Sequence, residues 1–388
     1  MLFRNARLIL ADRIVPSADL RVRDGKITEI SPSGQSLPVL PGEAALDAAG
    51  KFLSPGFVDL HIHGAVGRDA MEATPDAFEQ ICRYHATGGT TALALTTISA
   101  PPADILAVLH AAGTLDPNTT GGARLLGIHI EGPYFSLEKP GAHLPAHIRN
   151  PDPNEYREWL KYRERITQIT LAPELPGALA CIEAMVEAGI RVSGGHSDAW
   201  DEEAAAGHAH GMQQVTHTYN CMSGARRRGA YRVAGLLEYA LSEPTILCEL
   251  IADGHHVSPT LMRALYRAKG AGGIALVTDA GGGAGMPVGT RFSLGAIEAV
   301  VHPGISLTAD GQALACSVSR MNDLVKMMVE RVDVPLVEAV RMASAVPAGA
   351  LGLESQLGSL KEGLAADLVL LDDQLRVEMT FVNGQRVH

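Results

Sequence analysis

Short apolar runs alternate with longer amphipathic stretches over most of the chain. Between residues 55 and 282, β-rich runs are separated by segments with a helical pattern, such as "TPDAFEQICRYHATG" and "PGALACIEAMVEAG". This alternation is typical of βα units around a parallel sheet. The expected strands cover 56–63, 90–97, 124–131, 166–174, 190–196, 212–217, 245–253 and 273–280. Eight such strands predict an α/β protein with a (β/α)8 TIM barrel.

The two ends of the chain have a different pattern. Residues 1–30 and the last segment, "LKEGLAADLVLLDDQLRVEMTFVNGQRV", contain short hairpin strands with the turn signals "RDGK" and "VNGQ". Neither end is large enough to fold alone. We therefore expect one small β-sandwich domain built from 1–53 and 355–388, beside a barrel domain over 54–354.

The first barrel strand has one apolar face and one polar face. In "PGFVDLHIHG", Val58, Leu60 and Ile62 share one side of the strand. Asp59, His61 and His63 share the other side. The two histidines are either solvated residues of an edge strand or a pair of metal ligands. The rest of the chain has to decide between these interpretations.

Composition narrows the class of partner. The chain has 388 residues, 43 Asp plus Glu against 32 Lys plus Arg, and a formal charge of −11. This charge argues against nucleic acid or an anionic membrane as the main partner. A local basic pocket for one small anion remains compatible with it.

Cysteine usage and hydropathy indicate the compartment. The five cysteines are scattered and contain no CxxC pair, so they indicate reduced thiols in a cytoplasmic protein. No run of about 18 uncharged apolar residues occurs, and the N-terminus carries charges within its apolar positions. We expect no export signal and no membrane span.

Polar residues stand at the carboxyl ends of the predicted strands, where barrel enzymes place their catalytic groups. A lone histidine there is more often capped or solvated than a ligand. Joint placement at one rim favours a divalent metal, because neutral imidazole and carboxylate bind zinc, iron and manganese. These residues are His61, His63, Glu131, His196, His217 and Asp279.

A set of ordered motifs resembles a known family. The segments are "PGFVDLHIHG", "GIHIEGPYF", "TLAPE", "SGGHSDA", "THTYNCMS", "IADGHHV", "LVTDA" and "ADLVLLD". Together they resemble the amidohydrolase superfamily and, within it, the N-acetylglucosamine-6-phosphate deacetylases. The resemblance implies metal-dependent hydrolysis of the N-acetyl group of N-acetylglucosamine 6-phosphate, giving glucosamine 6-phosphate and acetate, in amino sugar metabolism.

The resemblance also implies roles for the residues at the rim. Glu131, His196 and His217 would hold one metal, and His61 with His63 would complete a second site that shares Glu131. Zn²⁺ is expected, with one or two ions per chain, and Fe²⁺ or Mn²⁺ are the alternatives. Asp279 would be the general base. His256, in "DGHHV", would polarise the acetyl carbonyl or contact the sugar.

Substrate contacts are implied for residues on loops. His143 matches a sugar-binding histidine and Asn220 a residue near the phosphate, although a surface histidine and a turn former are the alternatives. The family's "REPG" segment is replaced by "GARRRGAYRVAG". Arg227 or Arg228 would be the phosphate ligand, unless the three arginines form a solvated loop face. Arg263 matches an arginine donated by the partner subunit of a homodimer.

Two other functions remain open at this point. The altered arginine segment leaves another N-acetylated amino sugar, with or without phosphate, or an N-acyl amino acid as the substrate. A non-catalytic binding protein on a barrel scaffold is the alternative from a different class. It conflicts with a complete ligand set and an intact Asp279.

Overall fold

A parallel β-barrel forms the centre of the molecule in the computed structural model, which describes residues 1–116 and 120–388. Its strands pair in the order β17-β16-β13-β12-β11-β10-β9-β6, and a parallel bridge between Ile62 and Ala280 joins the first strand to the last. The strands are β6 (Phe57–Ile62), β9 (Thr90–Thr96), β10 (Arg124–Glu131), β11 (Ile166–Leu171), β12 (Arg191–Gly194), β13 (Met212–Val215), β16 (Leu247–Leu250) and β17 (Ile274–Leu276). All eight predicted strands and the (β/α)8 barrel are confirmed.

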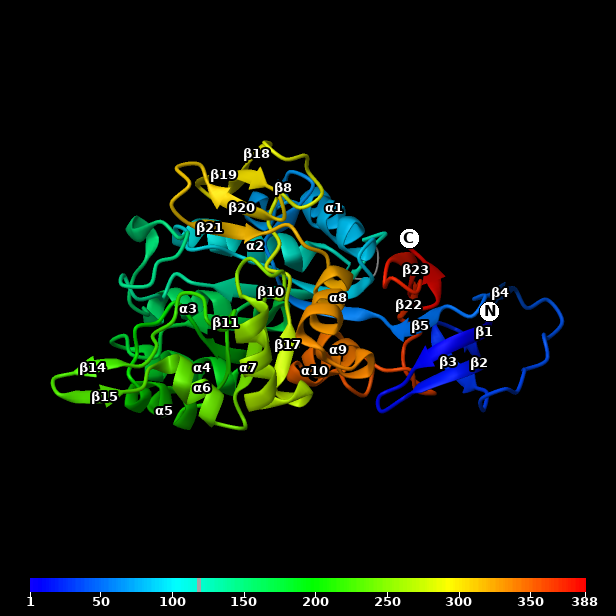
Figure 1. The fold of residues 1–388 in the computed structure, drawn as a ribbon. Coiled ribbons are helices and arrows are strands. Elements are labelled where there is room, and N and C mark those ends of the chain that lie inside the picture. The colour runs from blue at the N-terminus through cyan, green and yellow to red at the C-terminus, as the bar shows by residue number, and fades with distance from the viewer. Residues whose placement is uncertain (117–119) are drawn as a thin grey trace.

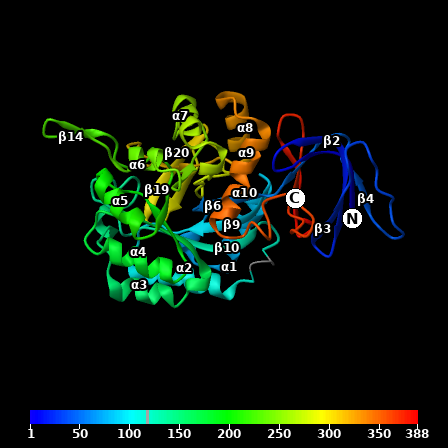
Figure 2. The same ribbon diagram turned by 90° about the horizontal axis from the view of Figure 1, so that it is seen from below.

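Helices cover the outside of the barrel (Figures 1 and 2). They are α1 (Pro75–Ala86), α2 (Pro102–Thr114), α3 (Pro153–Leu160), α4 (Ala178–Glu187), α5 (Asp201–Ala209), α6 (Leu236–Ser242), α7 (Pro259–Lys269), α8 (Met321–Val332), α9 (Leu336–Ala343) and α10 (Ala345–Ala350). Local sequence explains their starts. In α1, the Thr74 hydroxyl accepts the Ala77 N–H, and Pro75 occupies the first turn, where its missing N–H costs nothing.

Both termini contribute to a second sheet at one side of the barrel (Figure 1). Its strands are β1 (Leu2–Ile9), β2 (Ile14–Arg23), β3 (Lys26–Ile30), β4 (Ala45–Asp47), β5 (Phe52–Pro55), β22 (Leu368–Leu371), β23 (Val377–Val382) and β24 (Gln385–Arg386). The sheet order is β24-β23-β22-β5-β1-β2-β3, with β4 beside β1. The Phe3 and Phe381 rings nevertheless meet at 5.0 Å, so the sheet folds over its own core as the predicted sandwich.

The two terminal hairpins follow the turn chemistry of the sequence. Asp24 and Gly25 have φ of 48° and 74° between β2 and β3. Asn383 and Gly384 have φ of 49° and 71° between β23 and β24. Two successive left-handed residues make the turn that matches the twist of paired strands, which is why Asp-Gly and Asn-Gly occur there.

An antiparallel sheet that the sequence analysis did not anticipate follows the last barrel strand. It comprises β18 (Arg291–Leu294), β19 (Ile297–His302), β20 (Ile305–Thr308) and β21 (Leu314–Ser317), paired in chain order. Two short hairpins also lie outside the barrel, β7 (Gly64–Ala65) with β8 (Arg68–Asp69) and β14 (Arg226–Arg228) with β15 (Tyr231–Val233). Single 3-10 turns span Ala70–Glu72, Pro145–His147, Arg163–Arg165 and Ala271–Gly273.

The barrel strands separate an apolar outer layer from a polar interior. On β10, Ile128 and Ile130 belong to the main apolar cluster between strands and helices. His129 and Glu131 alternate with them and are also buried, so they point into the barrel. In the described ranges, no helix is both long and apolar enough to cross a membrane.

Candidate metal centre and active site

The predicted metal ligands meet at the carboxyl end of the barrel. His61 and Glu131 lie in β6 and β10, while His63, His196 and His217 follow β6, β12 and β13 within two residues. His196 and His217 have φ of 47° and 30°, and Asp279, beyond β17, has 48°. Left-handed backbone at residues other than glycine costs free energy and concentrates at functional sites. The fold thus holds three candidate side chains in strained positions.

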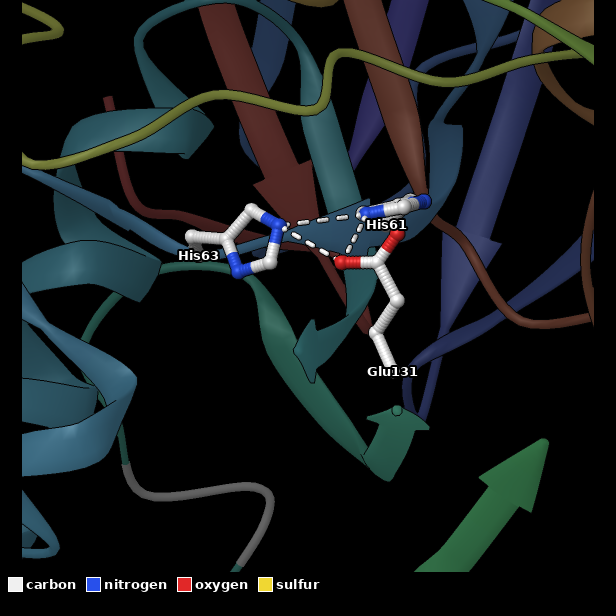
Figure 3. A group of neighbouring side chains, drawn as sticks. All are labelled: His61, His63 and Glu131. Carbon is white, nitrogen blue, oxygen red and sulfur yellow. Dashed lines mark hydrogen bonds and ion pairs between the residues drawn. The ribbon is translucent and has the colours of Figure 1, made fainter. Parts of the chain in front are cut away.

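Glu131 occupies the middle of the cluster. Its Oε2 lies 3.2 Å from His63 Nε2 and 3.5 Å from His61 Nε2 (Figure 3). Its Oε1 lies 3.1 Å from His217 Nε2 and 3.5 Å from His196 Nε2. One carboxylate therefore faces two pairs of imidazoles, which is the arrangement expected if Glu131 is shared between two cation positions.

The donor set fits a divalent cation. His196 Nδ1 donates to the Lys139 carbonyl at 2.9 Å, so Nε2 is the atom that would carry the lone pair in the neutral, cation-binding form of the ring. The Nε2 atoms of His196 and His217 are 3.1 Å apart, and those of His61 and His63 are 3.3 Å apart. Two groups of buried donors lie close enough together to hold a cation, His61 with His63 and Glu131, and Glu131 with His143 and His196.

His143 turns an N–H group, and not a lone pair, toward the cluster. The Ser99 N–H donates to His143 Nδ1 at 3.1 Å, so the proton of the neutral ring is on Nε2, which lies 3.6 Å from Glu131 Oε2. Burial lowers the pKa of His143 to about 4, which keeps the ring neutral at neutral pH. His143 therefore presents a donor to the site and is poorly suited to be a ligand.

Asp279 faces the same imidazoles. Its Oδ1 lies 3.2 Å from His63 Nε2 and 3.4 Å from His61 Nε2. Burial favours the neutral acid, but the two neighbouring imidazoles outweigh burial and lower the pKa of Asp279 to about 2. The side chain is thus a carboxylate at neutral pH, able to accept a proton.

His256 is held by a residue that the sequence analysis missed. Its Nδ1 donates to Asp253 Oδ2 at 2.7 Å, and Asp253 Oδ1 accepts the backbone N–H groups of His255 and His256 at 2.8 Å. Burial lowers the pKa of His256, but the bond to Asp253 and its charge raise it by more. Asp253 stands three residues before His256 at the end of a strand, which is the signal that could have identified it.

One small cavity of about 70 Å³ connects these groups. Besides His63, Glu131, His196 and His217, its lining includes Asp279, His256, His143 and Asn220. The Asn220 amide also donates to the His217 carbonyl at 3.1 Å, so it shapes the turn as well as lining the cavity. A larger cavity of about 720 Å³ lies on the other side of Ser99, but it contains none of the candidate site residues.

The three candidate arginines lie outside the cavity lining. Arg228 stacks on Trp200 at 4.0 Å and pairs with Glu202, while Arg227 is exposed on the other face of the β14–β15 hairpin. This hairpin projects from the barrel (Figures 1 and 2). Arg263 donates to the Arg331 carbonyl at 2.8 Å within its own chain. Phosphate contact by any of them stays a prediction.

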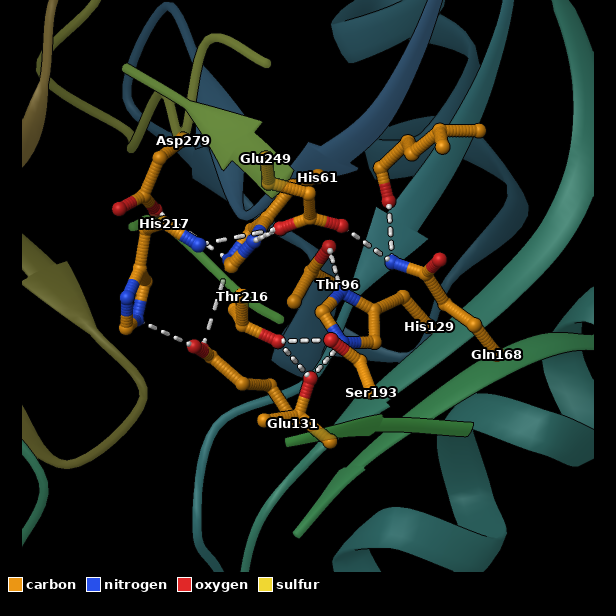
Figure 4. Close-up of polar contacts among 12 residues, drawn as sticks. His61, Thr96, His129, Glu131, Gln168, Ser193, Thr216, His217, Glu249 and Asp279 are labelled. Carbon is orange, nitrogen blue, oxygen red and sulfur yellow. Dashed lines mark hydrogen bonds and ion pairs between the residues drawn. The ribbon is translucent and has the colours of Figure 1, made fainter. Parts of the chain in front are cut away.

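Behind the cluster, the barrel interior holds a polar network that the sequence analysis also missed (Figure 4). Its centre is Glu249 on β16, which is fully buried and accepts hydrogen bonds from Gln168 and Gln214. The available signal was a carboxylate in the middle of the apolar strand "TILCELIAD". A buried carboxyl group in a strand needs hydrogen-bond partners, and such positions are frequently functional.

The fold and the site define a barrel hydrolase with a candidate centre for divalent metal. The profile described as the amidohydrolase family matches residues 52–387. An N-acetylglucosamine-6-phosphate deacetylase of Vibrio furnissii is 37% identical over 86% of this chain and 82% of its own. An N-acetylgalactosamine-6-phosphate deacetylase of Escherichia coli O157:H7 is 35% identical over 98% of both chains. The chain belongs to the amidohydrolase family and, within it, to the N-acetylglucosamine-6-phosphate deacetylase family.

Solved structures agree with this assignment. The N-acetylglucosamine-6-phosphate deacetylase of Pasteurella multocida superposes with a TM-score of 0.91 at 30% identity, covering 99% of this chain and 98% of the other. A variant of the Mycobacterium smegmatis enzyme in complex with N-acetyl-D-glucosamine-6-phosphate gives 0.91 at 29% identity, covering 100% and 99%. The whole chain therefore has the architecture of these enzymes.

Proposed function

We propose that the protein hydrolyses the acetyl amide of N-acetylglucosamine 6-phosphate to give glucosamine 6-phosphate and acetate. The observation that carries this proposal is one cavity lined by a cation-binding cluster, an ionised Asp279, His256 and the donor His143. Relatives with this activity in their names match along most of the chain.

Each residue has a defined task in this reaction. Glu131, His196 and His217, with His61 and His63 on the other side, would hold one or two divalent ions, for which we propose Zn²⁺. Such an ion lowers the pKa of water and polarises an acyl oxygen. Asp279 takes the proton of the attacking water and delivers it to the amine nitrogen as the C–N bond breaks.

The remaining residues would orient the sugar. His143 donates from Nε2 and is fixed in that tautomer by the Ser99 N–H. His256, anchored by Asp253, projects its other ring nitrogen toward the acetyl group or the sugar. Asn220 lines the cavity beside them and would lie near the phosphate.

A second substrate is favoured by a specific observation. The Escherichia coli O157:H7 relative, named for N-acetylgalactosamine 6-phosphate, matches 98% of this chain. The two sugars differ only in the configuration at C4, so the same centre would cleave either acetyl group. Other N-acetylated amino sugars and N-acyl amino acids are further alternatives, because the arginine segment departs from the family pattern.

A substrate panel tests both candidates. We expect kcat/KM to be highest for one of the two 6-phosphates and at least about tenfold lower for the sugars without phosphate, because a dianion adds charge-assisted contacts. Acetate release and free amine are both measured. Equal kcat/KM with and without phosphate, or activity restricted to N-acyl amino acids, would contradict the proposal.

We also propose a homodimer, a cytoplasmic location and the domain division 1–53 with 355–388 against 54–354. The β14–β15 hairpin exposes 77% of Tyr231, which supports a contact with a second copy.

The free thiols of the five cysteines suit a reducing compartment. A separate apolar cluster joining Phe3 and Leu53 to Leu368 and Phe381 supports the boundaries. Sedimentation measures the dimer, and limited proteolysis measures the boundaries.

A further inference from the structure

Glu249 lies at the floor of the candidate metal centre, inside the barrel (Figure 4). The residue is fully buried. Its Oε1 accepts from Gln168 Nε2 at 3.0 Å and from Gln214 Nε2 at 2.6 Å. Its Oε2 lies 3.3 Å from His61 Nδ1 and 3.4 Å from the His217 backbone N–H.

A carboxylate in this place is costly, so the fold must supply partners for it. Transfer of a carboxyl group into the interior is unfavourable unless its oxygen atoms are hydrogen-bonded. The two glutamine amides satisfy Oε1. Oε2 is left to the ring of His61 and, over a longer distance, to the chain at His217.

The chemistry of the carboxylate decides the tautomer of His61. A carboxylate oxygen only accepts, so His61 Nδ1 must carry the proton that it shares with Glu249. In the neutral form, which is the form that binds a cation, the ring would then turn its Nε2 lone pair to the cluster, where Glu131 Oε2 lies 3.5 Å and His63 Nε2 3.3 Å away. A glutamine at 249 would not impose this choice, because its amide end both donates and accepts.

We propose that Glu249 is a positioning residue for the metal centre and acts through His61. It fixes the ring orientation and tautomer that leave Nε2 free to bind a cation on the His61–His63 side of Glu131. This inference rests on the metal-dependent function proposed above. On the opposite side, His196 Nδ1 donates to the Lys139 carbonyl, and His217 reaches Glu249 Oε2 through its backbone N–H and not through its ring.

The test is a double-mutant cycle on metal affinity, which needs no substrate. Zn²⁺ affinity is measured in the full chain by competition with a chromogenic chelator, for the parent, Glu249→Gln, His61→Ala and the double variant. We expect Glu249→Gln to weaken the His61-dependent affinity by about 10- to 100-fold. We expect the same change to have no further effect once His61 is alanine.

Two outcomes would overturn the inference. One is parental affinity in Glu249→Gln, and the other is an equal loss with and without His61, which would indicate a general structural effect. Asp367→Asn is the matched control, because Asp367 is buried and bonded to Arg124 far from the cluster. It should lower the unfolding midpoint while leaving Zn²⁺ affinity unchanged. Absence of deacetylase activity in the parent would defeat the proposed function but leave this result interpretable.

Discussion

At the scale of single residues, neighbours decide what each histidine of the site can do. His61 shares its Nδ1 proton with a carboxylate and turns a lone pair to the cluster, whereas His143 accepts at Nδ1 and turns a proton to it. The two rings are chemically identical in the sequence. Their roles as ligand and donor follow from Glu249 and Ser99, which are distant along the chain.

Asp279→Asn is expected to keep the fold and the metal but to lower kcat by about 10³-fold, because an amide cannot accept the proton of the attacking water. KM should change little. Steady-state kinetics and metal analysis on the same preparation measure both effects. Near-parental kcat would place the general base elsewhere.

His85 predicts a pH dependence of stability. Burial lowers its pKa to about 4, and its Nε2 donates to the Gly64 carbonyl. His85 becomes protonated near pH 6.5 in the unfolded chain but only near pH 4 in the folded chain. The contribution of the neutral ring to the free energy of unfolding is therefore complete above pH 6.5 and is lost as the pH falls toward 4. Between pH 7.5 and 5, protonation of His85 in the unfolded chain lowers the free energy of unfolding by about 2 kcal/mol.

Urea unfolding of the parent and of His85→Gln at both pH values measures this difference. The variant should lose less free energy of unfolding between pH 7.5 and 5 than the parent, whatever its absolute stability. His110→Gln, on the exposed side of α2, is the control and should keep the parental pH dependence. An unchanged pH dependence in His85→Gln would show that His85 is not the group responsible.

At the scale of elements, the β14–β15 hairpin separates its arginines by face. Arg226 and Arg228 lie over Trp200, while Arg227 stands directly opposite Arg232 on the other side. Within the described part of the chain, Arg227 and Arg232 have neither a hydrogen bond nor an ion pair. Like charges directly opposite each other are destabilising, and an anion bound between Arg227 and Arg232 would relieve this repulsion.

Arg227→Ala is therefore expected to raise KM for the 6-phosphate by about 10- to 100-fold, since each charge-assisted contact contributes about 1.5–3 kcal/mol. Kinetics on the sugar without phosphate should not change. Arg228→Ala is the matched variant on the packed face and should mainly loosen the hairpin. If only Arg228→Ala raises KM, Arg228 and not Arg227 contacts the phosphate.

At the scale of the whole molecule, the candidate centre ties together strands from across the barrel. Its candidate ligands come from β6 and β10 and from the residues that directly follow β6, β12 and β13. A cation bound there would link these strands in the folded state, whereas the unfolded chain has no such site. Ligand binding stabilises by mass action, about 4 kcal/mol at a thousandfold excess over Kd.

Chelator-treated protein should unfold at a temperature several degrees lower than the metal-loaded protein, and added Zn²⁺ should restore it. Differential scanning calorimetry measures the shift. His196→Ala should show a smaller response, because it removes one ligand of the Glu131–His217 side. A Tm that is indifferent to chelator and to Zn²⁺ would argue against a resident metal.

The sequence by itself determined the elements that local patterns encode. Alternation of apolar and helical segments specified all eight barrel strands, and Asp24-Gly25 and Asn383-Gly384 specified two hairpins. The β18–β21 sheet carried similar turn signals, "HPGI" and "ADGQ", and could have been predicted. Period and turn chemistry are local properties, so they are visible in a single chain.

Only the tertiary structure decided which side chains support the site. Glu249 reaches His61 across 188 positions of sequence, and Ser99 reaches His143 across 44. Asp59, in the same strand as His61, bonds Thr278 instead of the cluster, although its face of the strand is shared with both histidines. Hydrogen bonds inside a closed barrel depend on how strands tilt and stagger around its axis, and the pattern along one strand does not encode that geometry.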